Sequence, residues 1–191
     1  MSSATSHAIK HRKVPKDVYL TPIAVASNMI KSIPAIEGEH WFDPFRGGGV
    51  FYDNYPVNVV KDYTEIAEGK DFFQYSGKAD VIVSNPPFSL IDKVLKKTFE
   101  LKPRVFSYLL LHGAMTPRRM EMIQKAGYGM IQIHSCKVFD WYGMAQFYTF
   151  GLGAPDLARI TFDRVVHRLT EAENTLQQRL QDEEEKRAAK K

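Results

Sequence analysis

The chain has 191 residues, of which 44% are hydrophobic, and it carries 26 basic side chains, 22 acidic ones and a single cysteine. This length fits one domain with a sizeable core, and two full domains would be cramped. A single cysteine excludes a disulfide scaffold and a zinc site built from several cysteines. No leader and no apolar run near the ~18 residues of a spanning helix stands out, so we expect a soluble intracellular protein, cytoplasmic or nuclear, without a membrane partner.

The net charge of +4 comes from the first 16 residues, which contain four basic side chains and no acidic one. The rest of the chain has equal numbers of acidic and basic side chains. We therefore predict a basic, flexible arm over residues 1–16. Such an arm could contact nucleic acid phosphates by releasing counterions, and the alternative is a solvated terminus without a ligand.

The segment after the arm predicts a helix followed by strands. Thr21 suits an N-cap and Pro22 the first helical position, and apolar residues at helical spacing continue until Pro34. Three strands are expected next, at residues 40–43, 57–60 and 79–84. The first ends in a run of glycines, and the last ends in an Asn-Pro-Pro-Phe tetrapeptide.

The middle of the chain continues this alternation of helices and strands. The expected elements are a helix at residues 91–99, a strand at 106–111, a helix at 116–127 and two strands at 129–139 and 146–152. The last two strands suggest an antiparallel pair. The order predicts an α/β fold, a doubly wound and mostly parallel sheet with an antiparallel edge hairpin, in a catalytic domain over residues 17–165.

The last part of the chain, residues 166–191, predicts a charged helix. No Gly or Pro occurs after Pro155, and Leu169, Leu176 and Leu180 form one apolar stripe at helical spacing. These leucines are too few to indicate a coiled coil. The helix is expected either to lie on the domain in contact with solvent or to contact a second copy or a partner subunit.

Two segments carry the candidate chemistry, and both follow predicted strands, where a doubly wound sheet binds ligands. After Asp43, the glycines at 47–49 allow a ligand to approach the backbone because no Cβ intervenes. This run lacks the Gly-Lys-Ser/Thr of phosphate-binding loops and the spaced glycines of dinucleotide binders. The two prolines of Asn85–Phe88 fix the backbone, so that a carboxamide and an aromatic ring flank a rigid turn.

Together these segments resemble class I S-adenosylmethionine-dependent methyltransferases, in particular the adenine-N6 group in which the cofactor motif comes first. Asp43–Phe51 is similar to their Asp-Pro-x-x-Gly-x-Gly-x-Phe motif, and Asn85–Phe88 to their catalytic Asn/Asp-Pro-Pro-Tyr/Phe motif. Tyr19–Pro22 is similar to the Tyr/Phe-Thr-Pro segment that precedes them, and Gly69–Phe73 to the Gly-x-Asp-Phe that faces the cofactor adenine. The resemblance covers about residues 17–153 and implies a Rossmann-like methyltransferase fold.

The resemblance implies S-adenosylmethionine as the cofactor and no metal. Thr21, at a helix N-terminus, would offer N–H groups and a hydroxyl to the carboxylate, and Asp43 would accept from the ammonium. Glu65 would bind the ribose hydroxyls, with Asp62 as the alternative, and Asp71 would accept from the adenine amine. The implied cofactor-binding set is Tyr19, Thr21, Pro22, Asp43, Gly47, Gly49, Phe51, Glu65, Asp71, Phe72 and Asn85, with Phe51 or Phe72 against the adenine ring.

Three features bear on how this pocket would work. Asp71 follows Glu65 so closely that no room is left for the helix that usually intervenes. Arg46 is larger than the small residues common in such a glycine turn, and it would either salt-bridge a nearby acid or partly block the pocket. Trp141 and Tyr142 would be core aromatics or contacts to the target base.

The resemblance assigns catalysis to Asn85, Pro86, Pro87 and Phe88. The side-chain oxygen of Asn85 and the carbonyl of Pro86 would each accept one N–H of the substrate amine, and Phe88 would stack on the base. The implied function is methyl transfer to adenine N6 in DNA, with the base flipped out of a duplex. The alternatives are an RNA adenine, a protein glutamine, or a non-catalytic methyltransferase-like subunit that binds nucleic acid or a partner.

Overall fold

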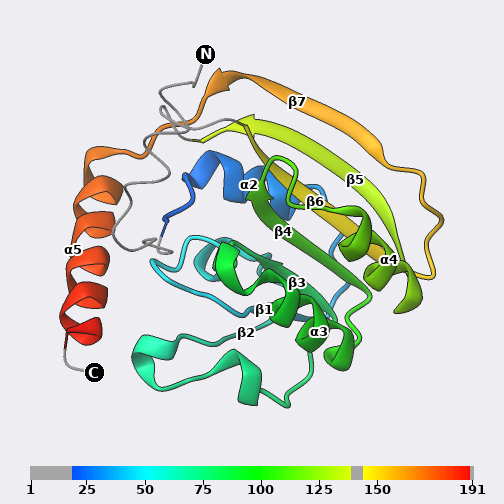
Figure 1. Cartoon of the computed structure of the whole chain (residues 1–191), viewed down its shortest axis with the longest axis horizontal. Coiled ribbons are helices and arrows are strands. Elements are labelled where there is room, and N and C mark those ends of the chain that lie inside the picture. The colour runs from blue at the N-terminus through cyan, green and yellow to red at the C-terminus, as the bar shows by residue number, and fades with distance from the viewer. Residues whose placement is uncertain (1–18, 139–143, 190–191) are drawn as a thin grey trace.

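The computed structural model describes residues 19–138 and 144–189 of the chain. The described residues form one seven-stranded sheet in the order β2-β1-β3-β4-β6-β5-β7, with helices on both faces (Figure 1). The strands are β1 (His40–Asp43), β2 (Val60–Tyr63), β3 (Val81–Ser84), β4 (Val105–Leu111), β5 (Tyr128–Lys137), β6 (Ala145–Leu152) and β7 (Arg159–Val166). The helices are α2 (Ile23–Lys31), α3 (Ile91–Leu101), α4 (Pro117–Lys125) and α5 (Glu171–Ala188). None of these helices is long and apolar enough to cross a membrane.

All strands of the sheet run in the same direction except β6. β1 pairs in parallel with β2 and β3, and β3 pairs in parallel with β4. β6 lies between β4 and β5 and is antiparallel to both. These pairings confirm the predicted doubly wound, mostly parallel α/β fold and its antiparallel pair.

A strand that the sequence analysis did not predict lies outside that pair. β7 pairs in parallel with β5 and forms the edge of the sheet. The prediction that the hairpin of β5 and β6 lies at the edge is therefore wrong. The carboxylate of Asp163 in β7 adds a side-chain contact to this pairing, because its Oδ2 lies 3.1 Å from Nε2 of His134 in β5; it also lies 2.6 Å from Nε2 of His167. Ile160 and Phe162 alternate with polar residues along β7, which was the available signal for a strand.

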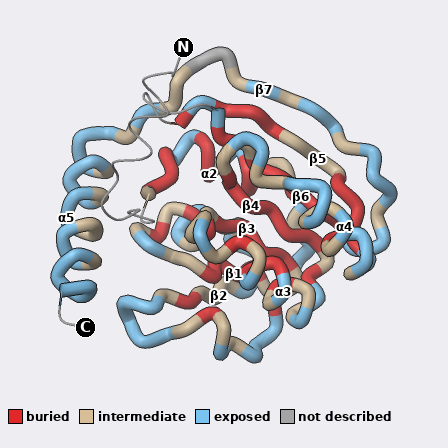
Figure 2. Tube along the Cα trace, in the orientation of Figure 1, coloured by how far each residue is buried: buried red, intermediate tan, exposed pale blue. Residues whose placement is uncertain are grey.

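Buried residues run along the strands of the sheet and recur in the helices that cover it (Figure 2). On one face α2 contributes its buried residues Val25, Ala26, Met29 and Ile30. On the other face α3 contributes Ile91, Val94, Leu95 and Thr98. The edge where the parallel strands end lies between these two helix layers, which is where an open α/β sheet binds ligands.

β2 lies later in the chain than predicted. It spans Val60–Tyr63, and Val57, at the predicted start, is 99% exposed. The run of valines before β2 therefore has β propensity without a partner strand, and pairing with β1 decides where the strand begins. Between β2 and β3 the chain forms 3-10 turns at Ile66–Glu68 and Phe72–Gln74 and no α-helix, as the short spacing of the two acids predicted.

The two predicted Thr-Pro helix starts differ in the structure. In α2, Pro22 rather than Thr21 occupies the N-cap position, and no side chain caps the helix there. In α4, Thr116 is the N-cap as predicted, and its hydroxyl accepts from the backbone N–H of Arg119. The Thr21 hydroxyl is thus left available for another contact.

Candidate functional site

A cavity of about 310 Å³ lies at the edge where the parallel strands end. Its walls come from the segment before α2, the glycine turn after β1, the end of β2, the diproline turn after β3, and one residue of α5. The lining residues are Tyr19, Leu20, Thr21, Phe45, Arg46, Gly47, Gly48, Val50, Phe51, Glu65, Ile66, Asn85, Pro87, Leu90 and Glu184. The motifs singled out in the sequence therefore meet at one site.

The glycine turn after β1 has a shape that glycine adopts more readily than other residues. Gly47 and Gly49 have φ angles of +49° and +85°. A Cβ on Gly48 would lie 2.9 Å from the side chain of Leu20 and 3.0 Å from that of Leu176 in α5. The turn thus allows both the segment before α2 and the C-terminal helix to approach its backbone closely.

Asp43 lies beneath the turn and outside the cavity lining. The side chain is fully buried, and its Oδ1 accepts from the hydroxyl of Ser84 at 2.6 Å and from the N–H of Phe45 at 3.3 Å. Its Oδ2 has no hydrogen-bond partner among the described residues. Burial raises the pKa of Asp43 to about 7, against the lowering effect of the Ser84 hydrogen bond. The contacts of Asp43 tie the ends of β1 and β3 to the glycine turn.

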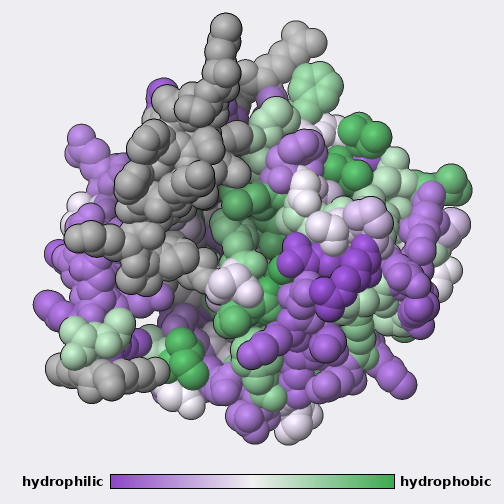
Figure 3. All heavy atoms as spheres, viewed as in Figure 1, coloured by the Kyte–Doolittle hydropathy of each residue, from purple (hydrophilic) through white to green (hydrophobic). Residues whose placement is uncertain are grey.

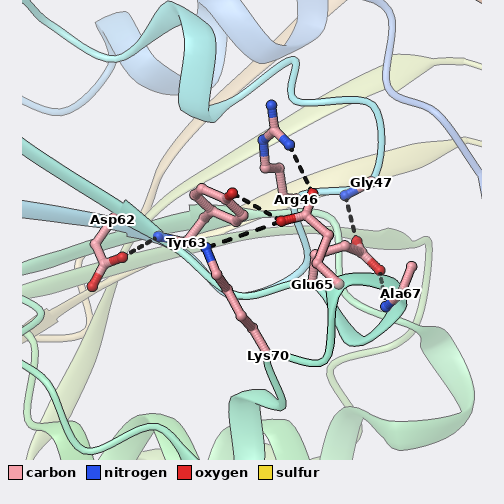
Figure 4. A network of polar contacts seen from close by, with 8 residues as sticks. Arg46, Gly47, Asp62, Tyr63, Glu65, Ala67 and Lys70 are labelled. Carbon is pink, nitrogen blue, oxygen red and sulfur yellow. Dashed lines mark hydrogen bonds and ion pairs between the residues drawn. The ribbon is translucent and has the colours of Figure 1, made fainter.

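Asp62 and Glu65, the two acids considered for binding the ribose, have different surroundings in the structure. Glu65 lines the cavity, where its Oε2 accepts from the N–H of Gly47 and its Oε1 from the N–H of Ala67, both at 2.9 Å. Asp62 is outside the lining and accepts from the hydroxyl of Tyr75 at 2.8 Å. Figure 4 shows Glu65 between Gly47 and Ala67, with Asp62 apart from it. Of the two acids, only Glu65 can contact a ligand in this cavity.

Arg46 pairs with an acid at the rim of the cavity. Its Nη1 lies 3.1 Å from Oε1 of Glu68, and its guanidinium lies over the ring of Tyr63 at 4.6 Å from the ring centre (Figure 4). The hydroxyl of Tyr63 donates to Oε2 of the same Glu68 at 2.9 Å. Of the two roles considered for Arg46, the structure shows the salt bridge to a nearby acid. Arg46 also contributes to the cavity wall.

Asn85 has an unpaired oxygen at the site. Its Nδ2 donates to the backbone carbonyl of Tyr19 at 2.9 Å, which fixes the orientation of the amide. Its Oδ1 is buried and has no hydrogen-bond partner among the described residues. A buried acceptor without a partner is costly, so this oxygen marks a position where a ligand N–H fits. The ring of Phe88 is inclined by 17° to that of Tyr19, with 6.3 Å between centroids.

The start of α2 provides a second unpaired oxygen, on Thr21. Its Oγ1 is buried without a partner among the described residues. Two backbone N–H groups beside it are already occupied, since Leu20 donates to Oε1 of Gln177 and Ile23 donates to Oε1 of Glu173 at 3.3 Å. The expectation that this helix start offers free N–H groups is therefore wrong for these two, because α5 supplies their acceptors.

The residues predicted to face an adenine are divided by the structure. Asp71 and Phe72 lie outside the cavity lining. Asp71 caps a 3-10 turn, where its Oδ1 accepts from the N–H of Phe73 at 2.9 Å, and Phe72 packs edge-on against Phe45 with 3% exposure. Phe51 is the aromatic candidate that contributes to the cavity wall.

The cavity thus contains part of the predicted set and several further residues. The predicted residues that line it are Tyr19, Thr21, Gly47, Phe51, Glu65, Asn85 and Pro87, and those outside it are Pro22, Asp43, Gly49, Asp71, Phe72, Pro86 and Phe88. Sequence reasoning missed the apolar walls Leu20, Val50, Ile66 and Leu90 and the acid Glu184. The apolar walls lie within a few residues of the motifs, so their positions in the sequence could have indicated them. Glu184 is far from every motif, and no pattern around it indicated a place in the cavity. Trp141 and Tyr142 lie outside the described residues.

Comparison with solved structures shows that the fold is that of Rossmann-like methyltransferases. A proposed RNA methyltransferase from Pyrococcus horikoshii has a TM-score of 0.56 and 18% identity, covering 74% of this chain and 92% of that chain. A methyltransferase subunit of a type I restriction-modification system from Streptococcus thermophilus has a TM-score of 0.55 and 14% identity, covering 84% and 53%. An E. cuniculi complex responsible for the methylation of a translation termination factor has a TM-score of 0.57 and 15% identity, covering 72% and 99%.

At these identities the similarity establishes the fold alone. No family model and no curated protein sequence matches the chain.

Proposed function

We propose that this chain is an S-adenosylmethionine-dependent methyltransferase that methylates N6 of adenine in DNA. The observation that carries the proposal is the Asn85 side chain, whose nitrogen is fixed by Tyr19 while its buried oxygen has no partner beside the cavity. The methyltransferase fold and the motif resemblance support the same class of reaction.

The residues around the cavity fit S-adenosylmethionine. When bound, it supplies an electrophilic methyl group on a sulfonium. A volume of about 310 Å³ lies within the range of small-molecule sites. The unpaired hydroxyl of Thr21 suits the carboxylate, Glu65 suits the ribose hydroxyls, and Phe51 offers an apolar face to the adenine. Asp43 does not line the cavity and would act on the ammonium end only by holding the glycine turn in place.

The diproline turn positions the substrate amine. Asn85 Oδ1 and the carbonyl oxygen of Pro86 each accept one N–H of the adenine amine. In the free base the N6 lone pair is delocalised into the ring, and two accepted hydrogen bonds draw the nitrogen towards a tetrahedral geometry that frees this lone pair for attack. Phe88 stacks on the base. Orientation by a fixed turn is the main contribution of the protein to such a displacement.

Nucleic acid is the substrate class that suits this site best. A flipped adenine requires a stacking ring beside the acceptor pair, and a basic arm at residues 1–16 would contact phosphates. RNA adenine is the second candidate. The chain spans 92% of the Pyrococcus horikoshii protein, which is described as a proposed RNA methyltransferase, and only 53% of the restriction-modification subunit.

The test is transfer of a tritiated methyl group to DNA, RNA and protein in parallel. We expect label in DNA as N6-methyladenine, and Asn85→Ala should lower the rate by at least about a hundredfold, the order expected when a positioned polar group is lost. Asn58→Ala, an exposed asparagine away from the cavity, is the matched control and should keep the wild-type rate. Label only in RNA or protein would overturn the choice of substrate, and unchanged transfer by Asn85→Ala would overturn the assigned role.

A further inference from the structure

Charge is distributed unevenly around the cavity. Helices α3 and α4, together with Lys102 at the C-cap of α3, carry seven basic and three acidic side chains. Helix α5, on the other side of the cavity, carries six acidic and three basic side chains (Figure 1). Beyond residue 16 the chain as a whole has equal numbers of both. The domain therefore presents a positive side and a negative side to a ligand that approaches the cavity.

The positive side begins at the diproline turn. Leu90, the N-cap residue of α3, lines the cavity together with Asn85. Asp92, in the first turn of α3, accepts from Nε of Arg119 at 2.6 Å and lies 3.6 Å from Nη1 of Arg118. Since both arginines belong to α4, this carboxylate joins the starts of the two helices. On the face in view in Figure 3, hydrophilic side chains gather over α3 and α4.

The positive charge at these helix starts exceeds what Asp92 can neutralise. Arg119 is held inwards, because it also donates to a backbone carbonyl at 2.7 Å. The side chain of Arg118 is 74% exposed, and Lys93 and Lys96 are exposed on α3. The hydrogen bond from Arg119 and the charges of Arg118 and Lys96 lower the pKa of Asp92, as expected for a carboxylate that faces several cations. We call Lys93, Lys96 and Arg118, which an anion can reach from solvent, the basic surface.

A nucleic acid backbone is the anion that suits the basic surface. A guanidinium can bind a phosphate through two N–H groups, and an ammonium attracts it as a point charge. Each cation that neutralises a phosphate also releases counterions, which favours binding. A base that is flipped into a pocket leaves the phosphates of its own strand at the mouth of that pocket. The acidic side chains of α5 repel the same backbone, so the strand is expected to follow α3 and α4.

We propose that the basic surface binds the sugar-phosphate backbone of the strand that carries the target base. This inference rests on the proposed function, in which the diproline turn receives that base. The basic surface positions the substrate and takes no part in binding the methyl donor, since none of its three residues lines the cavity.

The charge is tested in the full-length protein with a triple variant, Lys93→Gln/Lys96→Gln/Arg118→Gln. The matched control removes the same charges from exposed positions outside the two helices and the cavity lining, as Lys31→Gln/Lys137→Gln/Arg179→Gln. Fluorescence anisotropy would measure the affinities for a labelled duplex DNA and a labelled RNA hairpin over a range of salt concentrations.

The triple variant should bind DNA about thirtyfold more weakly at about 0.1 M salt, where charges more than about 10 Å from the DNA are largely screened. The slope of the logarithm of affinity against the logarithm of salt concentration should fall by about 2–3, because up to three phosphate contacts are lost. The control variant should stay within about twofold of wild type in affinity.

Further measurements separate a positioning role from a structural one. A charge-conserving variant, with both lysines changed to Arg and Arg118→Lys, should keep the DNA affinity within about threefold. In methyl transfer, the triple variant should raise the KM for DNA by about thirtyfold and leave kcat within about twofold, since only uniform substrate binding is lost. Calorimetry should give the same S-adenosylmethionine affinity for all variants, and their melting temperatures check that the fold is retained.

The outcomes separate this inference from the proposed function. If the triple variant and the control variant bind nucleic acid equally well, the inference is overturned while the proposed function stands. If affinity is lost for RNA and not for DNA, the basic surface binds the backbone of RNA, and DNA fails as the substrate. If DNA affinity depends on the basic surface but no methyl group reaches any nucleic acid, the proposed function fails and the basic surface remains a DNA-binding surface.

Discussion

Helices α3 and α5 lie on the same domain but are held by different interactions. α3 buries Ile91, Val94, Leu95 and Thr98 against the sheet, whereas α5 has no buried residue and contacts the domain through Glu173 and Gln177. Burial of apolar surface stabilises the whole fold, while a few hydrogen bonds at one site stabilise only the local arrangement. A helix held in the second way is free to carry function with little effect on folding.

Hydrogen exchange should show the largest difference between the two helices. Amides of α3 are expected to exchange through global unfolding and those of α5 through local opening, so the α5 amides should exchange about 10³-fold faster or more. Exchange measured by mass spectrometry on peptides of each helix checks this. Equal protection of both helices would show that α5 is part of the cooperative core.

Leucine truncations should give the next largest difference. Leu95 is fully buried in α3, so Leu95→Ala should lower the free energy of unfolding by about 3 kcal/mol. Leu180 is half-buried in α5, and Leu180→Ala should cost about 0.5 kcal/mol or less. Urea unfolding of both variants provides the measurement. A loss of similar size at the two positions would contradict the contrast.

The buried part of the domain should also show a pH dependence of stability. Because the pKa of Asp43 is raised to about 7 in the folded protein, the folded state binds the proton more tightly than the unfolded state does. The contribution of Asp43 to stability therefore falls as the pH rises from about 4 to about 7 and is constant above that range.

This effect is measured against Asp43→Asn, which cannot titrate. The difference in unfolding free energy between wild type and the variant should fall by about 2–3 kcal/mol from pH 5 to pH 8, to the disadvantage of wild type. A difference that stays constant over this range would show that Asp43 has an ordinary pKa.

The smallest effect is expected at the exposed rim of α3. The hydrogen bond from Arg119 to Asp92, 2.6 Å long, lowers the pKa of Asp92. A lowered pKa contributes stability above about pH 4 that is lost as the pH falls through the folded value. Asp92→Asn should therefore lower the unfolding free energy by about 0.5 kcal/mol at pH 7 and by less at pH 3, and an equal loss at both pH values would rule out the ion pair as its source.

Local signals in the sequence were sufficient for much of the fold. β1 could be predicted as a short apolar run that ends before the glycine turn, and α3 could be predicted because its apolar residues repeat at helical spacing. β2 was displaced because the valines at 57–60 signal β propensity, but pairing with β1 selects Val60–Tyr63. β7 was missed although its apolar residues alternate with polar ones, because its parallel partner β5 is separated from it in the sequence by β6.

The candidate site could be predicted where its motifs are short and follow strands. Glu65 and Asn85 were found in this way and line the cavity. Asp71 resembles a family motif, but the short chain after β2 uses its carboxylate to cap a turn. Glu184 could not be found, because the leucine stripe ends at Leu180 and no local pattern places the acidic run that follows it beside the cavity. Contacts between distant segments are not encoded in local periodicity.

The extra strand β7 determines where the polypeptide ends. β6 runs against the parallel strands, so a chain that stopped there would finish at the edge opposite the ligand. One more strand, parallel to β5, reverses direction and spans about 26 Å at ~3.3 Å per residue, which brings the backbone back to the edge that carries the cavity shortly before Thr170 begins α5. Adding a single crossing of the sheet is thus enough to let the C-terminal segment of a domain of this topology contribute residues to its cavity.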